Sequence, residues 1–380
     1  MIRWHILTGE YPPRPGGVSD YTQILARKLA EAGDEVHVWT GLCAAPAPAP
    51  AADGVTVHRL PGQFGPMSLR KMNRYLRAEK EPFRLLIQYV PQMFGFKGMN
   101  IFLARWIGRA RGFSPWVMFH EVAFCHTPGQ PKRHDLLASV QELMVRWIAR
   151  GMTRCFVSVP QWGERIRQLA PSGAVPEWLP TGSNVSDATN PSLVVELRRR
   201  FASKAGARVV AFFGTFGDVI MAMVLPALKH LLQKNDNWSV LLVGRGSDAY
   251  AEKVLAANPG LKNRLHFTGA LEPEEVAAHL AAAHVLYQPY PDGVSSRRSS
   301  VMAGLALGLP IVTNFGVATE TVWKDDELVV FADAANPEAV AQELCRCSED
   351  SIERNALMLR ARRGYEKNFA WTCTIEKLRR

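Results

Sequence analysis

The chain has 380 residues, of which 47% are apolar and 21% charged, so it favours two folded domains and excludes a disordered polypeptide. Its formal net charge of +10 lies mostly in the first half, which has 22 basic and 14 acidic side chains up to residue 190 and should favour an anionic neighbour. No run approaches the ~20 apolar residues of a membrane span, and the first residues do not form a signal peptide, so we expect a cytoplasmic protein.

The first half begins with a βαβ pattern. A short apolar run at residues 2–8 leads into a loop rich in Pro and Gly, then into a helix that Ser19 or Asp20 should cap. Strand, loop, helix and strand within 40 residues predict a parallel sheet with right-handed crossovers. The predicted strands of this half are residues 2–8, 35–40, 55–60, 85–89, 116–120 and 155–159.

The second half repeats the alternation after a polar, irregular stretch. We interpret residues 181–194 as a linker, which separates a first domain at 1–180 from a second at 195–365. Both domains should be doubly wound α/β structures. The predicted strands of the second half are residues 208–213, 239–243, 265–268, 285–288, 311–313 and 328–331.

Ligands of open parallel sheets bind beyond the carboxyl ends of the strands, which singles out a few loops. Gly16 and Gly17 allow close approach of the backbone just before a helix, where free N–H groups favour an anion. An ordinary turn between strand and helix is the alternative. His120 ends an apolar strand and could donate a hydrogen bond or carry a proton, or be structural.

The segment from residue 290 to 310 carries the strongest signal. It follows a strand, offers Gly293 and Ser295, and places Arg297 and Arg298 where an apolar helix begins. Hydroxyls, arginines and free N–H groups at one helix start favour a diphosphate. The alternative is a solvated arginine pair on a surface turn.

Taken together, these motifs resemble glycosyltransferase family 4. The resemblance covers nearly the whole chain: G-E-Y-P-P-x-x-G-G-V near the start, F-H-E around residue 120, L-P-T-G-S-N at the domain junction, and G-L-A-L-G-L-P-I-V-T followed by Glu320. It implies the GT-B fold, with two Rossmann-like domains that face a central cleft, the first on the acceptor side and the second on the donor side. It also implies that residues 366–380 form a helix that crosses back to the first domain.

The same resemblance implies the reaction and the roles of single residues. A sugar would move from a nucleoside diphosphate to an acceptor with retention at the anomeric carbon, in the synthesis of a glycan, glycolipid or polysaccharide. Gly16 and Gly17 would lie by the donor phosphates and the acceptor, and His120 over the reacting sugar. Asp292 and Glu320 would hold sugar hydroxyls.

Two departures from the family pattern concern the donor site. Counted back from Gly308, the two glutamates of the usual Glu-x7-Glu motif are replaced by Ser295 and Ala303, so Asp292 could stand in for the first. The Arg and Lys that usually follow the first strand of the second domain are also missing. We therefore predict that Arg297 and Arg298 supply the positive charge for the diphosphate.

The predicted function is thus a hexosyl-type glycosyltransferase that needs neither cofactor nor metal, since no Asp-x-Asp motif is present. A scaffolding subunit of the same fold and a nucleotide-sugar epimerase are the alternatives. The predicted catalytic residues are His120 and Asp292. The predicted donor-binding residues are Gly16, Gly17, Gly214, Thr215, Gly244, Arg245, Gly293, Ser295, Arg297, Arg298 and Glu320.

The acceptor is a glycan, a lipid-linked sugar or a small molecule. From Arg70 to Arg111 there are ten basic residues and two acidic ones, with aromatic side chains between them. Such a surface could rest on the anionic inner face of a membrane, and a solvated basic face is the alternative. No nucleic-acid motif accompanies the charge, so a nucleic-acid partner is not expected.

Overall fold

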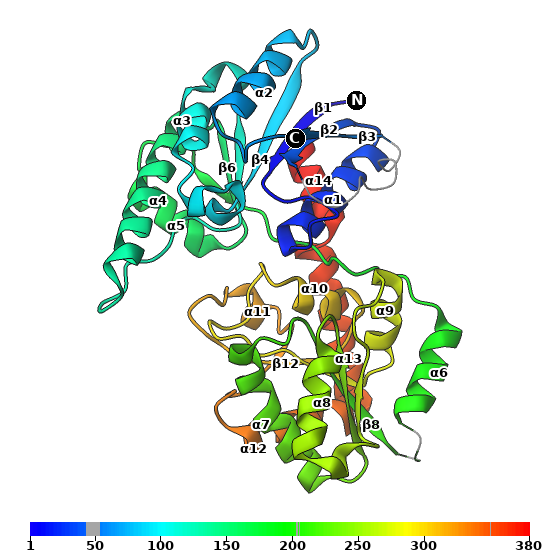
Figure 1. The fold of residues 1–380 in the computed structure, drawn as a ribbon. Helices are drawn as coiled ribbons and strands as arrows, with labels where there is room; N and C mark the ends of the chain where they lie inside the picture. Colours follow the sequence, from blue (N-terminus) through cyan, green and yellow to red (C-terminus); the bar gives the residue numbers. More distant parts are fainter. Residues whose placement is uncertain (43–53, 203, 205, 350) are drawn as a thin grey trace. The chain divides into compact units, whose positions relative to one another are not determined.

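A computed structural model describes residues 1–42, 54–202, 204, 206–349 and 351–380. The chain forms two units, each with its own parallel sheet and its own apolar core (Figure 1). The first unit holds residues 1–180 together with 374–380, and the second holds residues 181–373. All the strands predicted from the sequence are present.

The first unit is built on a seven-stranded sheet with the order β3-β2-β1-β4-β5-β6-β7. Every neighbouring pair of strands is parallel. The short edge strand β7 was not predicted, because three half-buried residues carry no apolar alternation. The strands are β1 (Arg3–Thr8), β2 (Glu35–Gly41), β3 (Val55–Leu60), β4 (Phe83–Tyr89), β5 (Trp116–Phe119), β6 (Arg154–Val157) and β7 (Pro176–Trp178).

One apolar cluster joins a face of this sheet to helices α2, α3, α4 and α5. Helix α14 (Trp371–Arg379) reaches the first unit with its last residues: Arg379 forms an ion pair with Asp34 at 3.2 Å, and Lys377 donates to the carbonyl of Trp178 at 2.6 Å. The helices are α1 (Gly17–Glu31), α2 (Pro66–Ala78), α3 (Ile101–Arg109), α4 (Lys132–Gly151) and α5 (Pro160–Leu169), with short 3-10 turns η1 (Pro91–Phe94), η2 (Phe96–Gly98) and η3 (Arg111–Phe113).

The start of α1 differs from the prediction. The helix begins at Gly17, and neither Ser19 nor Asp20 caps it. Instead the Ser19 hydroxyl donates a hydrogen bond to the carbonyl of Arg14 at 2.7 Å, which holds the preceding loop. The cap was misassigned because serine bonds backbone groups of loops as readily as those of helix ends.

The second unit has a six-stranded parallel sheet with the order β10-β9-β8-β11-β12-β13. The strands follow the same order as in the first unit. The switch point, where the strand order reverses, lies between the first and the fourth strand of the unit, β8 and β11. The strands are β8 (Arg208–Phe213), β9 (Trp238–Val243), β10 (Leu265–Phe267), β11 (Val285–Tyr287), β12 (Ile311–Thr313) and β13 (Val330–Phe331).

Helices α7, α8 and α12 share an apolar cluster with one face of this sheet, while α10 packs against α13. Trp371 at the start of α14 donates from its indole to the carbonyl of Ser183 at 2.7 Å. The helices are α6 (Pro191–Phe201), α7 (Asp218–Lys234), α8 (Ser247–Ala257), α9 (Pro273–Ala281), α10 (Ser299–Ala306), α11 (Val322–Asp325), α12 (Pro337–Glu349) and α13 (Ser351–Asn368), with the 3-10 turn η4 (Pro259–Leu261).

Candidate active site

Gln288 joins the two strands that flank the switch point of the second sheet. Its amide accepts a hydrogen bond from the backbone N–H of Phe213 at 3.1 Å and donates one to the carbonyl of Phe213 at 2.8 Å. The side chain is 1% exposed. A buried amide with both of its groups bonded to backbone fixes the ends of β8 and β11 against each other. Sequence reasoning missed this residue, although its signal is visible: a single amide at the end of the apolar strand V-L-Y-Q.

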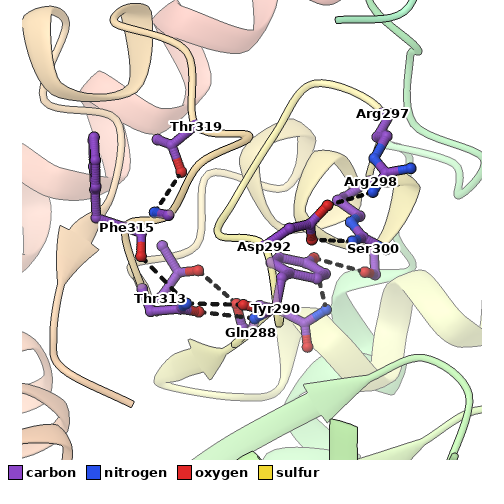
Figure 2. Close-up of polar contacts among 11 residues, drawn as sticks. Gln288, Tyr290, Asp292, Arg297, Arg298, Ser300, Thr313, Phe315 and Thr319 are labelled. Atoms are coloured by element: carbon purple, nitrogen blue, oxygen red, sulfur yellow. Dashed lines mark hydrogen bonds and ion pairs between the residues drawn. The ribbon is translucent and has the colours of Figure 1, made fainter. Parts of the chain in front are cut away.

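Tyr290 anchors the loop that follows β11. Its hydroxyl shares a hydrogen bond of 2.8 Å with Ser300, and the guanidinium of Arg298 lies 5.0 Å from the centre of its ring (Figure 2). Asn314, just after β12, accepts from the backbone N–H of Tyr290 and donates to its carbonyl, both at 2.8 Å. Burial raises the pKa of Tyr290 to about 12. The loop is therefore held to both α10 and β12.

Asp292 is the centre of a charged cluster at the carboxyl edge of the second sheet. Its two carboxylate oxygens accept hydrogen bonds from Arg297 and Arg298, one arginine to each oxygen (Figure 2). Partial burial alone would raise the pKa of Asp292, but the charges of Arg298 and Arg297 outweigh it and lower the pKa below its usual value. Two cations share one anion, so the cluster keeps a net positive charge.

Gly293 is placed where two loops touch through their backbones. Its φ of 85° lies in the left-handed region, and a Cβ atom there would sit 2.3 Å from the backbone nitrogen of Gly316. Gly316 is restricted by the same contact from the other side, because a Cβ atom added there would lie 2.4 Å from the carbonyl oxygen of Asp292. Glycine is required at both positions because any side chain would separate the loops after β11 and β12.

Glu320 supports the same loop from inside the protein. It is 6% exposed, and its carboxylate accepts the backbone N–H of Ser296 at 3.0 Å, the hydroxyl of Ser296, and the indole N–H of Trp323 at 2.7 Å. Burial raises the pKa of Glu320. The carboxylate is thus engaged by protein donors, so this arrangement favours a role in positioning the loop over direct contact with a sugar.

The two positions at which the count along the sequence predicts the glutamates of the motif are both buried. Ser295 and Ala303 are 0% exposed, the latter inside α10. The Ser295 hydroxyl has no hydrogen-bond partner among the described residues. A glutamate in either place would bury a charge at considerable cost. Asp292, half-buried and paired with arginines, is therefore the better-placed substitute at this edge.

A second group of predicted donor residues lies on the loops after β8 and β9. Gly244 has a φ of 124°, and a Cβ atom there would sit 2.4 Å from the carbonyl oxygen of Gly214, so these loops also touch through their backbones. Arg245 and Thr215 are exposed. Arg245 forms no hydrogen bond or ion pair with another described residue, which leaves its charge available to a ligand.

His120 lies at the carboxyl edge of the first sheet, as predicted, and has close neighbours. Its Nε2 is 2.7 Å from Oε1 of Gln88, and the ring of Tyr21 packs edge-on at 4.9 Å between centroids. Burial lowers the pKa of His120 to about 3, so the imidazole is neutral. The amide oxygen of Gln88 can only accept, which assigns the proton to Nε2. Gln88, at the end of β4, is a second functional candidate that sequence reasoning missed.

Gly16 and Gly17 precede helix α1 in the first unit, and Tyr21 of the same helix reaches His120. A Cβ atom on Gly16 would sit 2.4 Å from a carboxylate oxygen of Glu10, whereas one on Gly17 would meet nothing within 4 Å. Burial raises the pKa of Glu10. A carboxylate against this loop suits a hydroxyl or a cation better than a phosphate, which sequence reasoning did not foresee.

Comparison with known proteins identifies the family of this chain. Residues 16–182 match the family described as glycosyl transferase 4-like domain, and residues 207–350 match glycosyl transferases group 1. The chain belongs to the group 1 glycosyltransferases. This membership confirms the family and the enzyme class predicted from the sequence, and the solved structures confirm the fold: the chain is a glycosyltransferase of the GT-B fold. A scaffold without activity and an epimerase are not favoured.

Three relatives show how far the similarity extends. The GDP-mannose-dependent α-(1-6)-phosphatidylinositol monomannoside mannosyltransferase of Mycobacterium tuberculosis is 25% identical, over 100% of this chain and 97% of its own length. The D-inositol 3-phosphate glycosyltransferase of Salinispora tropica is 24% identical, over 96% of this chain and 80% of its own. The Anabaena protein HepE in complex with UDP and glucose is 16% identical, with a TM-score of 0.68 over 100% of this chain and 98% of its own.

In this glycosyltransferase the predicted site residues form three groups. The first group lies on the loops after β11 and β12 and includes Asp292, Gly293, Ser295, Arg297, Arg298 and Glu320. Gly214, Thr215, Gly244 and Arg245 form a second group on the loops after β8 and β9. Gly16, Gly17 and His120 belong to the first unit, where α1 connects them.

Proposed function

We propose that the nucleotide-sugar donor binds at the carboxyl edge of the second sheet, with its diphosphate held by Arg297, Arg298 and Arg245. The first two begin helix α10, and Arg245 precedes helix α8, so free N–H groups of two helix starts add to the guanidinium charges. These groups would stabilise the departing diphosphate without a metal ion.

The observation that carries this proposal is the pairing of Asp292 with two arginines. Without a donor, the carboxylate partly neutralises both guanidinium groups. A diphosphate brings more negative charge than one carboxylate and can replace Asp292 as their partner. Asp292 would then be free to accept hydrogen bonds from hydroxyl groups of the sugar, the role that the missing glutamate has in the family.

His120 and Glu320 would act in different ways. The neutral His120 has a fixed N–H toward Gln88, and we propose that the ring lies against the reacting sugar. Glu320 would position the loop, since it holds Ser296 by two hydrogen bonds and is itself held by Trp323. Removal of Glu320 should therefore weaken donor binding indirectly.

The acceptor that we propose carries a phosphate and is linked to a lipid. Two curated relatives are named for acceptors that carry a phosphate, a phosphatidylinositol mannoside and an inositol phosphate, and the first of these is a lipid. In this chain, helix α2 exposes Arg70, Lys71, Arg74 and Arg77, which suits the anionic inner face of a membrane. Within the described ranges no helix is long and apolar enough to cross a membrane. We therefore place the enzyme in the cytoplasm, at the membrane surface.

The test of the donor site is thermal stabilisation by UDP, GDP and their sugars, measured for the native chain and for Arg297→Gln and Arg298→Gln. A bound donor at a hundredfold its dissociation constant raises the stability by about 2.7 kcal/mol. We expect each substitution to weaken donor affinity at least about tenfold, because each removes a charge-assisted hydrogen bond. Arg199→Gln on α6, also exposed, is the matched control and should bind as the native chain does.

Two results would contradict the proposal. Unchanged donor affinity in both variants would show that Arg297 and Arg298 do not contact the donor. Release of free nucleotide with an epimerised sugar, instead of transfer or slow hydrolysis, would indicate an epimerase.

A further inference from the structure

A pocket of about 550 Å³ opens on the first unit between the ends of helices α2 and α3 and the turn η3. Its lining includes Arg77 of α2, Trp106 and Arg109 of α3, and Phe113 of η3, and it contains no acidic residue. Helix α2 is drawn in blue and helix α3 in cyan in Figure 1. Arg77 was named above among the exposed basic residues of α2, and the other side chains of the lining belong to none of the sites described above.

The two arginines of this pocket are exposed and carry uncompensated charge. Neither Arg77 nor Arg109 forms a hydrogen bond or ion pair with another described residue. The nearest acidic residue along α2, Glu79, is engaged by Arg3 at 2.9 Å and lies 3.8 Å from His5. Basic residues in the last turn of a helix do stabilise its dipole. That explains each arginine by itself, but not why both line one pocket from which acids are missing.

The other walls of the pocket are formed by an amide and two aromatic side chains, which suit a ligand with a polar part and an apolar part. The indole N–H of Trp106 donates to Oδ1 of Asn73 at 3.4 Å, which orients the amide N–H groups of Asn73 as further donors in the lining. Trp106 and Phe113 lie 6.3 Å apart and pack against the core of the unit. Guanidinium groups and amide N–H groups are suitable donors for a phosphate, and the aromatic wall offers an apolar surface to the rest of the ligand.

The pocket is separate from the edge of the sheet that carries His120. The turn η3 leads into the amino end of β5, whereas His120 follows its carboxyl end. The four residues of β5 span roughly 13 Å at 3.3 Å each. A ligand in this pocket would therefore not be the sugar acceptor at its reacting group.

We propose that this pocket binds a phosphate group, as a monoester or diester, and so forms a second anion site at the end of the first unit opposite the reaction. The phosphate can belong to a lipid headgroup or to a soluble compound. The site does not depend on how the donor is bound, because every residue in it belongs to the first unit and none is proposed to contact the nucleotide.

The experiment compares two double variants of the full chain. Arg77→Gln with Arg109→Gln removes the pocket arginines, and Lys132→Gln with Arg133→Gln removes two exposed basic side chains from the start of helix α4, outside the lining and outside the basic surface of α2. Both variants lose two positive charges. Binding is measured by calorimetry with sn-glycerol 3-phosphate and by sedimentation with phosphatidylcholine vesicles that contain or lack phosphatidylglycerol.

We expect the pocket variant to lose at least about tenfold in affinity and the control variant less than about threefold, since a hydrogen-bonded phosphate is worth more than a screened charge. A loss confined to the soluble probe or to the anionic vesicles identifies the source of the phosphate. Equal losses of affinity in both variants would show that binding depends only on the surface charge, and would overturn the proposal of a phosphate site in this pocket. The absence of binding by the native chain to either probe would overturn it as well. Donor-induced stabilisation, measured in parallel, should remain in both variants and shows that they are folded.

Discussion

The carboxyl edges of the two sheets share a strand order but carry side chains with different contacts and charges. In each unit the fourth strand of the sequence, next to the switch point, ends with a buried glutamine: Gln88 in the first and Gln288 in the second. Gln288 bonds the backbone of the neighbouring strand, whereas Gln88 bonds the side chain of His120. One glutamine therefore holds the sheet together, and the other orients a candidate catalytic group.

The charges of the two edges differ as well. The second edge gathers Arg297 and Arg298 around Asp292, and it has the unpaired Arg245 on the next pair of loops. At the first edge, His120 is neutral and Glu10 faces the glycine loop. The difference indicates that one edge is built to accept a polyanion and the other to orient hydroxyl groups, although both have the same strand order.

The largest effect that we expect comes from Gly293→Ala. The new Cβ would meet the backbone of Gly316, and the φ of 85° is unfavourable for any side chain, so we expect a loss of about 3 kcal/mol in the free energy of unfolding. Donor-induced stabilisation should be lost as well, because Asp292 moves with the loop. Thermal unfolding with and without nucleoside diphosphate measures both.

Two further alanine variants sharpen the comparison of the edges. Gly9→Ala in the first unit places a Cβ 2.4 Å from the carbonyl oxygen of Met93 and should destabilise that unit without changing donor affinity. Gly260→Ala, with nothing within 4 Å, is the control. If Gly293→Ala kept full stability and donor binding, the backbone contact between the loops would be irrelevant to the site.

The two glutamines should respond differently to replacement by leucine. Gln288→Leu leaves the N–H and the carbonyl of Phe213 without partners, so we expect a loss of about 2 kcal/mol in stability. Gln88→Leu removes the acceptor of one imidazole N–H, so we expect a smaller loss in stability but a fall in kcat as His120 loses its orientation. Urea unfolding and steady-state transfer rates separate the two effects. Equal changes in both variants would show that Gln88 is structural too.

The fold could be predicted from the sequence because its signals are local. Apolar runs such as R-V-V-A-F-F and W-S-V-L-L-V mark strands by themselves, and glycines mark the turns that follow. The short strand β7 was missed because its three residues are only half-buried. The contacts between the loops after β11 and β12 could not be predicted either. Gly293 and Gly316 lie on separate loops, and the sequence does not indicate which residue each of them contacts.

The candidate site residues were named from the sequence without their pairings, and their roles in donor binding and catalysis stay predictions. Arg297 and Arg298 stood out as a charged pair before a helix, yet only the structure shows that Asp292 holds both. Glu320 was expected to face the sugar, and the structure places its carboxylate among donors of the protein. Hydrogen-bond partners depend on the packing of distant segments, which residue types and spacing do not encode.

Acid should weaken the first unit more than the second. His5 and His120 are buried in the first unit, and burial lowers the pKa of each to about 3. For His5, the nearby His37 and His58 lower the pKa further. The second unit has the partly exposed His284, whose pKa is lowered to about 4, first by burial and then by three arginines. Both units should lose stability as the pH falls, but the first has more to lose.

The direction of this pH dependence follows from the number of protons that the folded and the unfolded chain bind. Below a pH of about 6.5 the histidines of the unfolded chain bind protons, whereas the buried histidines of the folded chain stay neutral down to about pH 3. The free energy of unfolding therefore falls as the pH decreases from about 6.5 to about 3. At pH 5.5 each of His5 and His120 should cost about 1.4 kcal/mol relative to neutral pH. Native-state hydrogen exchange at pH 7.5 and 5.5, corrected for intrinsic rates, reports each unit separately. His120→Gln should remove about 1.4 kcal/mol of the loss in the first unit, because glutamine has no charge to gain. An equal loss in both units, or no relief in this variant, would mean that the imidazole of His120 takes up its proton without unfolding, and that the first edge is more accessible to water than its packing indicates.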